Sequence, residues 1–100
     1  MAVNSATSAL HCAMMSLGLD IGDEVITSPY TMSATSTSIL MVGGIPIFAD
    51  CNDQMCLDFD STIKRVSSKT KAICIVHIGG IVSESIIPLK SYCEKNRIHL

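Results

Sequence analysis

The chain has 100 residues, of which 48% are hydrophobic and 16% are charged, and its formal net charge at pH 7 is −2. Charged residues make up about 25% of a typical globular domain, so this low content indicates apolar surface that further polypeptide or a partner covers. The Lys and Arg residues form no basic stripe, and no apolar run approaches the roughly 18 residues of a membrane span, so we expect neither nucleic acid nor a membrane as a partner.

The first half of the chain alternates expected helices and strands. Apolar residues recur at three- and four-residue steps between Ser5 and Leu17, which predicts a helix that Ser5 or Thr7 caps and Gly18 ends. Further along, the pattern predicts a strand at 24–27, a helix at 31–42 and an apolar strand at 45–49.

The second half continues the alternation. Asp60 is expected to cap a short helix through Val66, and residues 72–76 form the most apolar strand. A last helix is expected at 85–96, and a new strand begins at 97–100. Strands that alternate with helices imply parallel pairing and right-handed crossovers. The predicted fold class is therefore α/β, a partial three-layer α/β/α arrangement with a mostly parallel sheet.

The chain stops inside an expected strand, which is a poor place for a domain to end. We therefore expect residues 1–100 to form one incomplete domain, whose carboxyl-terminal part is absent.

The segment from Asn4 to Leu10 places Ser and Thr at the first turn of the first expected helix. Free backbone N–H groups and the positive end of the helix dipole favour an anion at such a turn, and hydroxyl groups add donors. Ser and Thr are also preferred capping residues. The residues alone therefore leave a phosphate site and an ordinary helix cap both open.

Two further segments follow expected strands, where ligands bind in open parallel sheets. One runs from Tyr30 to Thr35, and the other contains His77, Gly79 and Gly80. His77 fits either a proton shuttle or a structural histidine. No G-x-S-x-G sequence occurs, which disfavours a serine hydrolase that would use this histidine.

Cys51 and Cys56 have the spacing of zinc ligands, but no second Cys or His pair accompanies them, so we expect no metal site. Five cysteines at irregular spacings fit a reducing compartment better than a disulfide framework. We therefore expect a cytoplasmic protein.

Five segments, in order, resemble the DegT/DnrJ/StrS family of sugar aminotransferases. Residues 4–11, N-S-A-T-S-A-L-H, resemble N-S-(G/A)-T-(S/A)-A-L-H, and residues 17–27 are similar to L-G-(I/L)-x-x-G-D-E-V-I-T. Residues 39–48 match A-I-x-x-x-G-A-x-P-V-F, residues 69–73 match (K/R)-T-K-A-I, and residues 76–80 match V-H-(L/I)-x-G. The resemblance covers essentially the whole chain.

The resemblance implies a large domain of the fold-type-I transferases that use pyridoxal phosphate (PLP), of which this chain is an amino-terminal fragment. Such enzymes are usually cytoplasmic homodimers. They transfer an amino group, usually from glutamate, to a keto-sugar nucleotide in the biosynthesis of polysaccharides and glycoconjugates.

The resemblance also implies which residues bind the cofactor. Thr7 and Ser8 hold the phosphate of PLP, and Ala6 keeps the turn tight. Met32 stands where the family has an aromatic residue that stacks on the pyridine ring. A thioether covers a ring face but has no flat π surface.

No catalytic residue is assigned within these 100 residues. In the family, the lysine that bonds to the cofactor and the aspartate that pairs with the pyridinium nitrogen lie beyond position 100, and the chemistry needs both. We therefore expect no transaminase activity from the chain alone. The alternative hypothesis is a non-catalytic remnant, or a domain that binds phosphate compounds and pairs with a full-length homologue.

Overall fold

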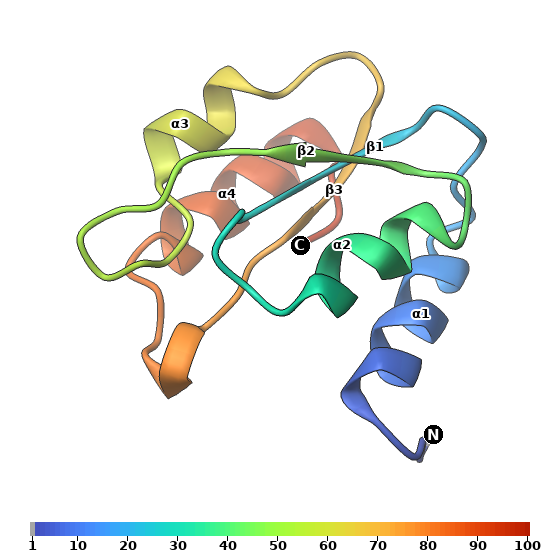
Figure 1. Ribbon diagram of the computed structural model, residues 1–100. Helices are drawn as coiled ribbons and strands as arrows, with labels where there is room; N and C mark the ends of the chain where they lie inside the picture. The colour runs from blue at the N-terminus through green and yellow to red at the C-terminus, as the bar shows by residue number, and fades with distance from the viewer. Residues whose placement is uncertain (1) are drawn as a thin grey trace.

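A computed structural model describes residues 2–100 (Figure 1). The elements, in order, are α1 (Ala6–Ser16), β1 (Glu24–Thr27), α2 (Ser33–Leu40), β2 (Ile45–Phe48), α3 (Phe59–Lys64), β3 (Thr70–Cys74), the 3₁₀ helix η1 (Ile78–Gly80) and α4 (Ile86–Asn96). Within these residues, no helix has the length and apolarity that crossing a bilayer requires.

The sheet has three parallel strands in the order β2-β1-β3. On the free side of β3, His99 forms an isolated parallel bridge with Ala72. The N–H of His99 donates to the carbonyl of Lys71 at 3.0 Å, and the N–H of Ile73 donates to the carbonyl of His99 at 2.8 Å. Of residues 97–100, where the sequence predicts a strand, only His99 pairs with β3, and Arg97 is still the C-cap of α4.

Helices cover both faces of the sheet, which confirms the predicted three-layer α/β/α arrangement. Figure 1 shows α1 and α2 on one side and α3 and α4 on the other. The core on the α1 side contains Met14, Val25, Ile39 and Ala72. The core on the α4 side contains Ile26, Ala49, Leu57, Ile73, Leu89 and Cys93. Successive strand residues thus enter opposite cores, as a strand buried on both faces requires.

Several expected boundaries differ from the structure: α2 spans Ser33–Leu40 instead of 31–42, and two further differences have a visible cause. Asp58, not Asp60, caps α3: its backbone is extended, and its Oδ1 atom accepts a hydrogen bond from the N–H of Ser61 at 2.7 Å. Asp60 lies in the first turn, where its charge still suits the helix dipole. β3 spans Thr70–Cys74 instead of 72–76, because its ladder with β1 starts at Thr70 and ends where Thr27 pairs with Cys74.

Candidate functional site

A hollow of about 490 Å³ lies between α1, from Ala6 to Ala13, and the carboxyl end of β3. α1 contributes Ala6 and Ala9 to its lining, α2 contributes Thr35, and the end of β3 contributes residues 74–77. Parallel strands bring all their carboxyl ends to one edge of the sheet, which is where α/β proteins bind ligands. The hollow therefore lies where the sequence predicts a site.

The amino terminus of α1 has unpaired backbone donors. Ser5 caps the helix by accepting a hydrogen bond from the N–H of Ser8 at 3.1 Å. Within residues 2–100, the N–H groups of Ala6 and Thr7 have no acceptor, and no acidic residue lies in the first turn. Two free donors at the positive end of an 11-residue helix favour an anion.

The two hydroxyl groups predicted to hold a phosphate differ in their surroundings. The Ser8 hydroxyl donates to Oδ1 of Asn4 at 2.9 Å and lies 3.0 Å from the hydroxyl of Ser5. The Thr7 side chain is exposed and has no hydrogen-bond partner within the described residues. Thr7 is therefore free to bind a ligand, whereas Ser8 takes part in the helix cap.

Met32 lies apart from the other predicted site residues. It is the N-cap residue of α2, it is 76% exposed, and it does not line the hollow. Its loop is held by Ser28, whose hydroxyl accepts from the N–H of Tyr30 at 3.0 Å and lies 3.1 Å from the thiol of Cys51. Of the four predicted residues, Ala6 lines the hollow and Thr7 and Ser8 share its helical turn, while Met32 stands outside the lining.

Thr35, which ends the candidate segment that starts at Tyr30, lines the hollow, whereas sequence reasoning missed the segment from Cys74 to Val76. The available signal was the position of this segment at the end of the most apolar strand. Burial raises the pKa of the Cys74 thiol above its ordinary value of 9.0, and a hydrogen bond from Thr27 opposes this shift. The thiol therefore stays protonated at neutral pH, and the floor of the hollow is uncharged.

His77 ends the lining on the β3 side. Its Nδ1 atom accepts a hydrogen bond from the N–H of Ser83 at 3.1 Å. This bond supports the structural interpretation of His77, because it anchors the turn that follows β3. It leaves Nε2 as the ring nitrogen that carries the proton in the neutral side chain.

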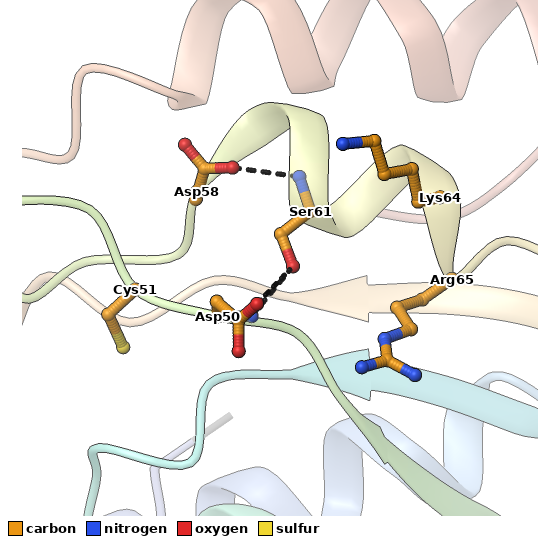
Figure 2. Close-up of a pocket in the computed structure, with 6 residues that line it drawn as sticks. All are labelled: Asp50, Cys51, Asp58, Ser61, Lys64 and Arg65. Carbon is orange, nitrogen blue, oxygen red and sulfur yellow. Dashed lines mark hydrogen bonds between the residues drawn. The ribbon is translucent and has the colours of Figure 1, made fainter.

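A second pocket, of about 420 Å³, lies beside the end of β2 and is shown in Figure 2. Asp58 accepts from the N–H of Ser61, and the Ser61 hydroxyl donates to Asp50 at 3.3 Å (Figure 2). Two carboxylates at this position repel a phosphate group, and their hydrogen bonds serve the cap of α3. Lys64 and Arg65 come from the other end of that short helix. We assign this pocket a structural role.

The cysteines with zinc-ligand spacing have other neighbours. Cys51 lies beside the hydroxyl of Ser28, and the thiol of Cys56 lies 3.9 Å from the carbonyl oxygen of Ile81. In the part of the chain that the structure describes, no three His, Cys, Asp or Glu side chains are grouped as metal ligands.

The three-layer fold, with a hollow at the carboxyl edge of its parallel strands, places the chain in the class of α/β proteins that bind ligands at that edge. The chain belongs to the DegT/DnrJ/EryC1/StrS aminotransferase family, whose sequence profile matches residues 1–100. The family expected from the sequence is thereby confirmed.

Several relatives support this membership. The spore coat polysaccharide biosynthesis protein SpsC of Bacillus subtilis is 46% identical over 81 residues, which cover 79% of this chain and 21% of SpsC. GDP-perosamine synthase of Vibrio cholerae is 33% identical over 99 residues, which cover 98% of this chain and 27% of that enzyme. The chain thus spans about a quarter of the length of these relatives.

Solved structures agree. DesV of S. venezuelae has a TM-score of 0.92 at 28% identity, with 97% of this chain and 26% of DesV covered. NtdA of Bacillus subtilis, solved with the cofactor PMP, has a TM-score of 0.86 at 33% identity, with 92% of this chain and 21% of NtdA covered. The expected fold is confirmed, and solved relatives hold the expected cofactor, since Spr1654 of Streptococcus pneumoniae has a PLP form and a PMP form.

Proposed function

We propose that this chain forms the phosphate-binding end of the PLP site in a sugar aminotransferase. The enzyme would transfer an amino group, from glutamate, to a keto-sugar nucleotide used in polysaccharide or glycoconjugate biosynthesis. The observation that carries the proposal is the amino terminus of α1, where the N–H groups of Ala6 and Thr7 have no acceptor within residues 2–100 and Ala6 lines the hollow.

The names of two relatives support the proposed substrates. One is the GDP-perosamine synthase already described. The other, from Bacillus subtilis, is a 3-oxo-glucose-6-phosphate:glutamate aminotransferase that is 40% identical over 80 residues, covering 79% of this chain. These names combine an oxidised sugar, a phosphorylated group and glutamate.

The residues of the proposed site bind different parts of the cofactor. The N–H groups of Ala6 and Thr7, with the Thr7 hydroxyl, bind the phosphate, and the small side chain of Ala6 allows close approach. Ser8 adds its hydroxyl once it leaves Asn4, and the apolar floor formed by residues 74–76 accepts the ring. The role proposed for Met32, which is exposed at the start of α2, is to cover a face of the ring. Bound PLP supplies an electron sink for the substrate carbon.

We also propose that the chain alone does not catalyse transamination. All five lysine side chains are exposed, and none lines the hollow. Lys64 lines the pocket of Figure 2, and the Nζ atom of Lys71 lies 3.9 Å from Asp23. These positions support the proposal that another stretch of polypeptide supplies the reactive amine.

The layer formed by α1 and α2 supports a homodimer, which we also propose. Neither helix contains Asp, Glu, Lys or Arg. Met15, Leu40 and Met41 on this layer are each more than half exposed. An uncharged, apolar outer layer is typical of surface that an assembly covers.

The proposal is tested by measuring the PLP dissociation constant of the intact protein from the quenching of its intrinsic fluorescence. Thr7→Val removes a hydroxyl that contacts a charged phosphate, so we expect affinity to fall about tenfold or more. Thr37→Val is the matched control, because Thr37 is also an exposed helical threonine but lies away from the hollow. Equal affinity in wild type and both variants would reject the phosphate site at α1.

A further inference from the structure

His77 lines the same hollow as Ala6, the first residue of the helix that carries Thr7. It follows β3 directly, and together with Ala6 and Thr35 it lines the hollow. A ligand that has its phosphate at the amino terminus of α1 and fills the hollow therefore meets His77 as well.

The orientation of the imidazole ring is set by a buried backbone. Its Nδ1 atom accepts from the N–H of Ser83, and Ser83 is fully buried. The Ser83 hydroxyl in turn accepts from the N–H of Ser85 at 3.3 Å, and the neighbouring Glu84 accepts from the amide of Asn52 at 3.0 Å. The turn that holds the ring is thus tied both to the start of α4 and to the loop after β2.

This arrangement fixes the tautomer of the neutral ring. Because Nδ1 accepts a hydrogen bond, the proton lies on Nε2, which becomes a donor. Within residues 2–100, Nε2 has no protein partner.

The other polar side chains of the lining are not comparable donors. The hydroxyl of Thr35 lies 2.9 Å from that of Thr31, and the two form a hydrogen bond. Cys74 presents a weakly donating thiol. Thr35 is also buried, so among the lining residues His77 is the exposed side chain with a strong donor that has no partner within residues 2–100.

We propose that the Nε2–H group of His77 is a ligand-binding donor, which bonds to an oxygen of the molecule in the hollow. That oxygen belongs either to PLP or to the amino-acid donor, and the same hydrogen bond would serve both. The proposal rests on the proposed function, since it takes the position of the phosphate from the α1 site.

Two substitutions distinguish the proposed bond from Nε2 to the ligand from the bond between Nδ1 and the N–H of Ser83. In His77→Asn, the amide oxygen takes the place of Nδ1 and still accepts from Ser83, but no donor stands at the Nε2 position. In His77→Gln, the longer amide presents a donor near the Nε2 position but no acceptor to Ser83. The measurements use the intact protein: the midpoint of thermal unfolding, the PLP dissociation constant, and KM for L-glutamate in the half-reaction.

We expect His77→Asn to unfold within a few degrees of the wild type while one ligand constant rises about threefold to tenfold, the loss of one hydrogen bond. A rise in the PLP dissociation constant assigns the oxygen to the cofactor, and a rise only in KM assigns it to L-glutamate. His77→Gln is expected to lower the unfolding midpoint more than it changes either constant. In ¹⁵N NMR of the ligand-free protein, Nδ1 should show the shift of an unprotonated ring nitrogen.

The proposal is overturned if His77→Asn leaves both constants unchanged, or if the NMR spectrum shows the proton on Nδ1. Thr7→Val distinguishes this failure from a failure of the proposed function. If Thr7→Val weakens PLP binding while His77→Asn has no effect, the phosphate site stands and His77 is structural only. If neither variant changes a ligand constant, both proposals fail.

Discussion

The hydroxyl of Ser8 donates a hydrogen bond to the side-chain oxygen of Asn4 at 2.9 Å, one turn of backbone away. Ser8 therefore differs from its neighbour Thr7, whose side chain is exposed and has no hydrogen-bond partner within the described residues. A phosphate that recruits the Ser8 hydroxyl must first displace Asn4, whereas the Thr7 hydroxyl is available at once.

We therefore expect Ser8→Ala to weaken PLP binding by a smaller factor than Thr7→Val. Fluorescence titration of the intact protein measures both, and Asn4→Ala provides a further comparison because it frees the Ser8 hydroxyl. A larger loss for Ser8→Ala than for Thr7→Val would show that the cap opens completely when PLP binds.

Cys74 is expected to react slowly with iodoacetamide, because the thiolate is the nucleophile and burial raises the pKa of this thiol above 9.0. The rate should rise with pH only above about pH 9, and bound PLP should protect Cys74, which lines the hollow. Cys93 is the internal control, since burial also raises its pKa but it packs on the opposite face of the sheet. Mass spectrometry of alkylated peptides gives both rates. Protection of Cys93 but not Cys74 by PLP would contradict the location of the site.

The same shift predicts a loss of stability at alkaline pH. Above pH 9.0 the unfolded Cys74 thiol loses its proton while the folded one keeps it, so the free energy of unfolding falls as pH rises toward the folded pKa. The contribution is fully present below the unfolded pKa. Urea unfolding of wild type and Cys74→Ala between pH 8 and about pH 10 measures it, and the variant should show the smaller decline. Identical declines would mean that this thiol does not contribute.

Asp58 and Asp60, at the start of α3, should contribute differently to the free energy of unfolding. Asp58→Ala removes the acceptor for the N–H of Ser61 and should cost about 1 kcal/mol in the free energy of unfolding. Asp60→Ala removes only a charge in the first turn and should cost about 0.3–1 kcal/mol at low salt, less as salt is added. Urea unfolding at two salt concentrations measures both costs. A larger cost for Asp60→Ala than for Asp58→Ala would indicate that Asp60 is the cap.

The core on the α4 side should be sensitive to cavities. Leu89 is fully buried there, so Leu89→Ala is expected to lower the free energy of unfolding by about 2–5 kcal/mol. Ile87 lies on the same helix but is 77% exposed, so Ile87→Ala should change the free energy of unfolding by less than about 0.5 kcal/mol. If Ile87→Ala proves equally costly, a partner surface must cover that side of α4.

Much of the fold was predictable because its signals are local. The strand at 24–27 was predicted with the bounds of β1, and Ser5 caps α1 as expected. The predictions failed where two local choices were nearly equal in energy. Asp58 and Asp60 are both good capping residues, and the backbone conformation that selects Asp58 depends on the bridge between Cys51 and Leu57 that shapes the preceding loop.

The candidate site was predictable in part for the same reason. The Ser and Thr residues in the first turn of α1 indicate either a helix cap or an anion site. The resemblance to the family implies that the anion is a phosphate. The place of Met32 depends on a loop that Ser28 holds against Cys51, a contact between residues 23 positions apart. Residues alone did not decide between the two interpretations of His77, because its partner Ser83 is part of a turn with no distinctive pattern.

The alternation of periodic apolar segments by itself determined a parallel α/β sheet covered on both faces, because helix and strand periodicity are properties of short stretches of chain. Only the tertiary structure decided that Ala6, Thr35 and His77 line one hollow. These residues come from three distant segments, and they meet because β1 pairs with β2 on one side and β3 on the other. That pairing is a long-range choice, set by the packing of whole helices rather than by any local preference.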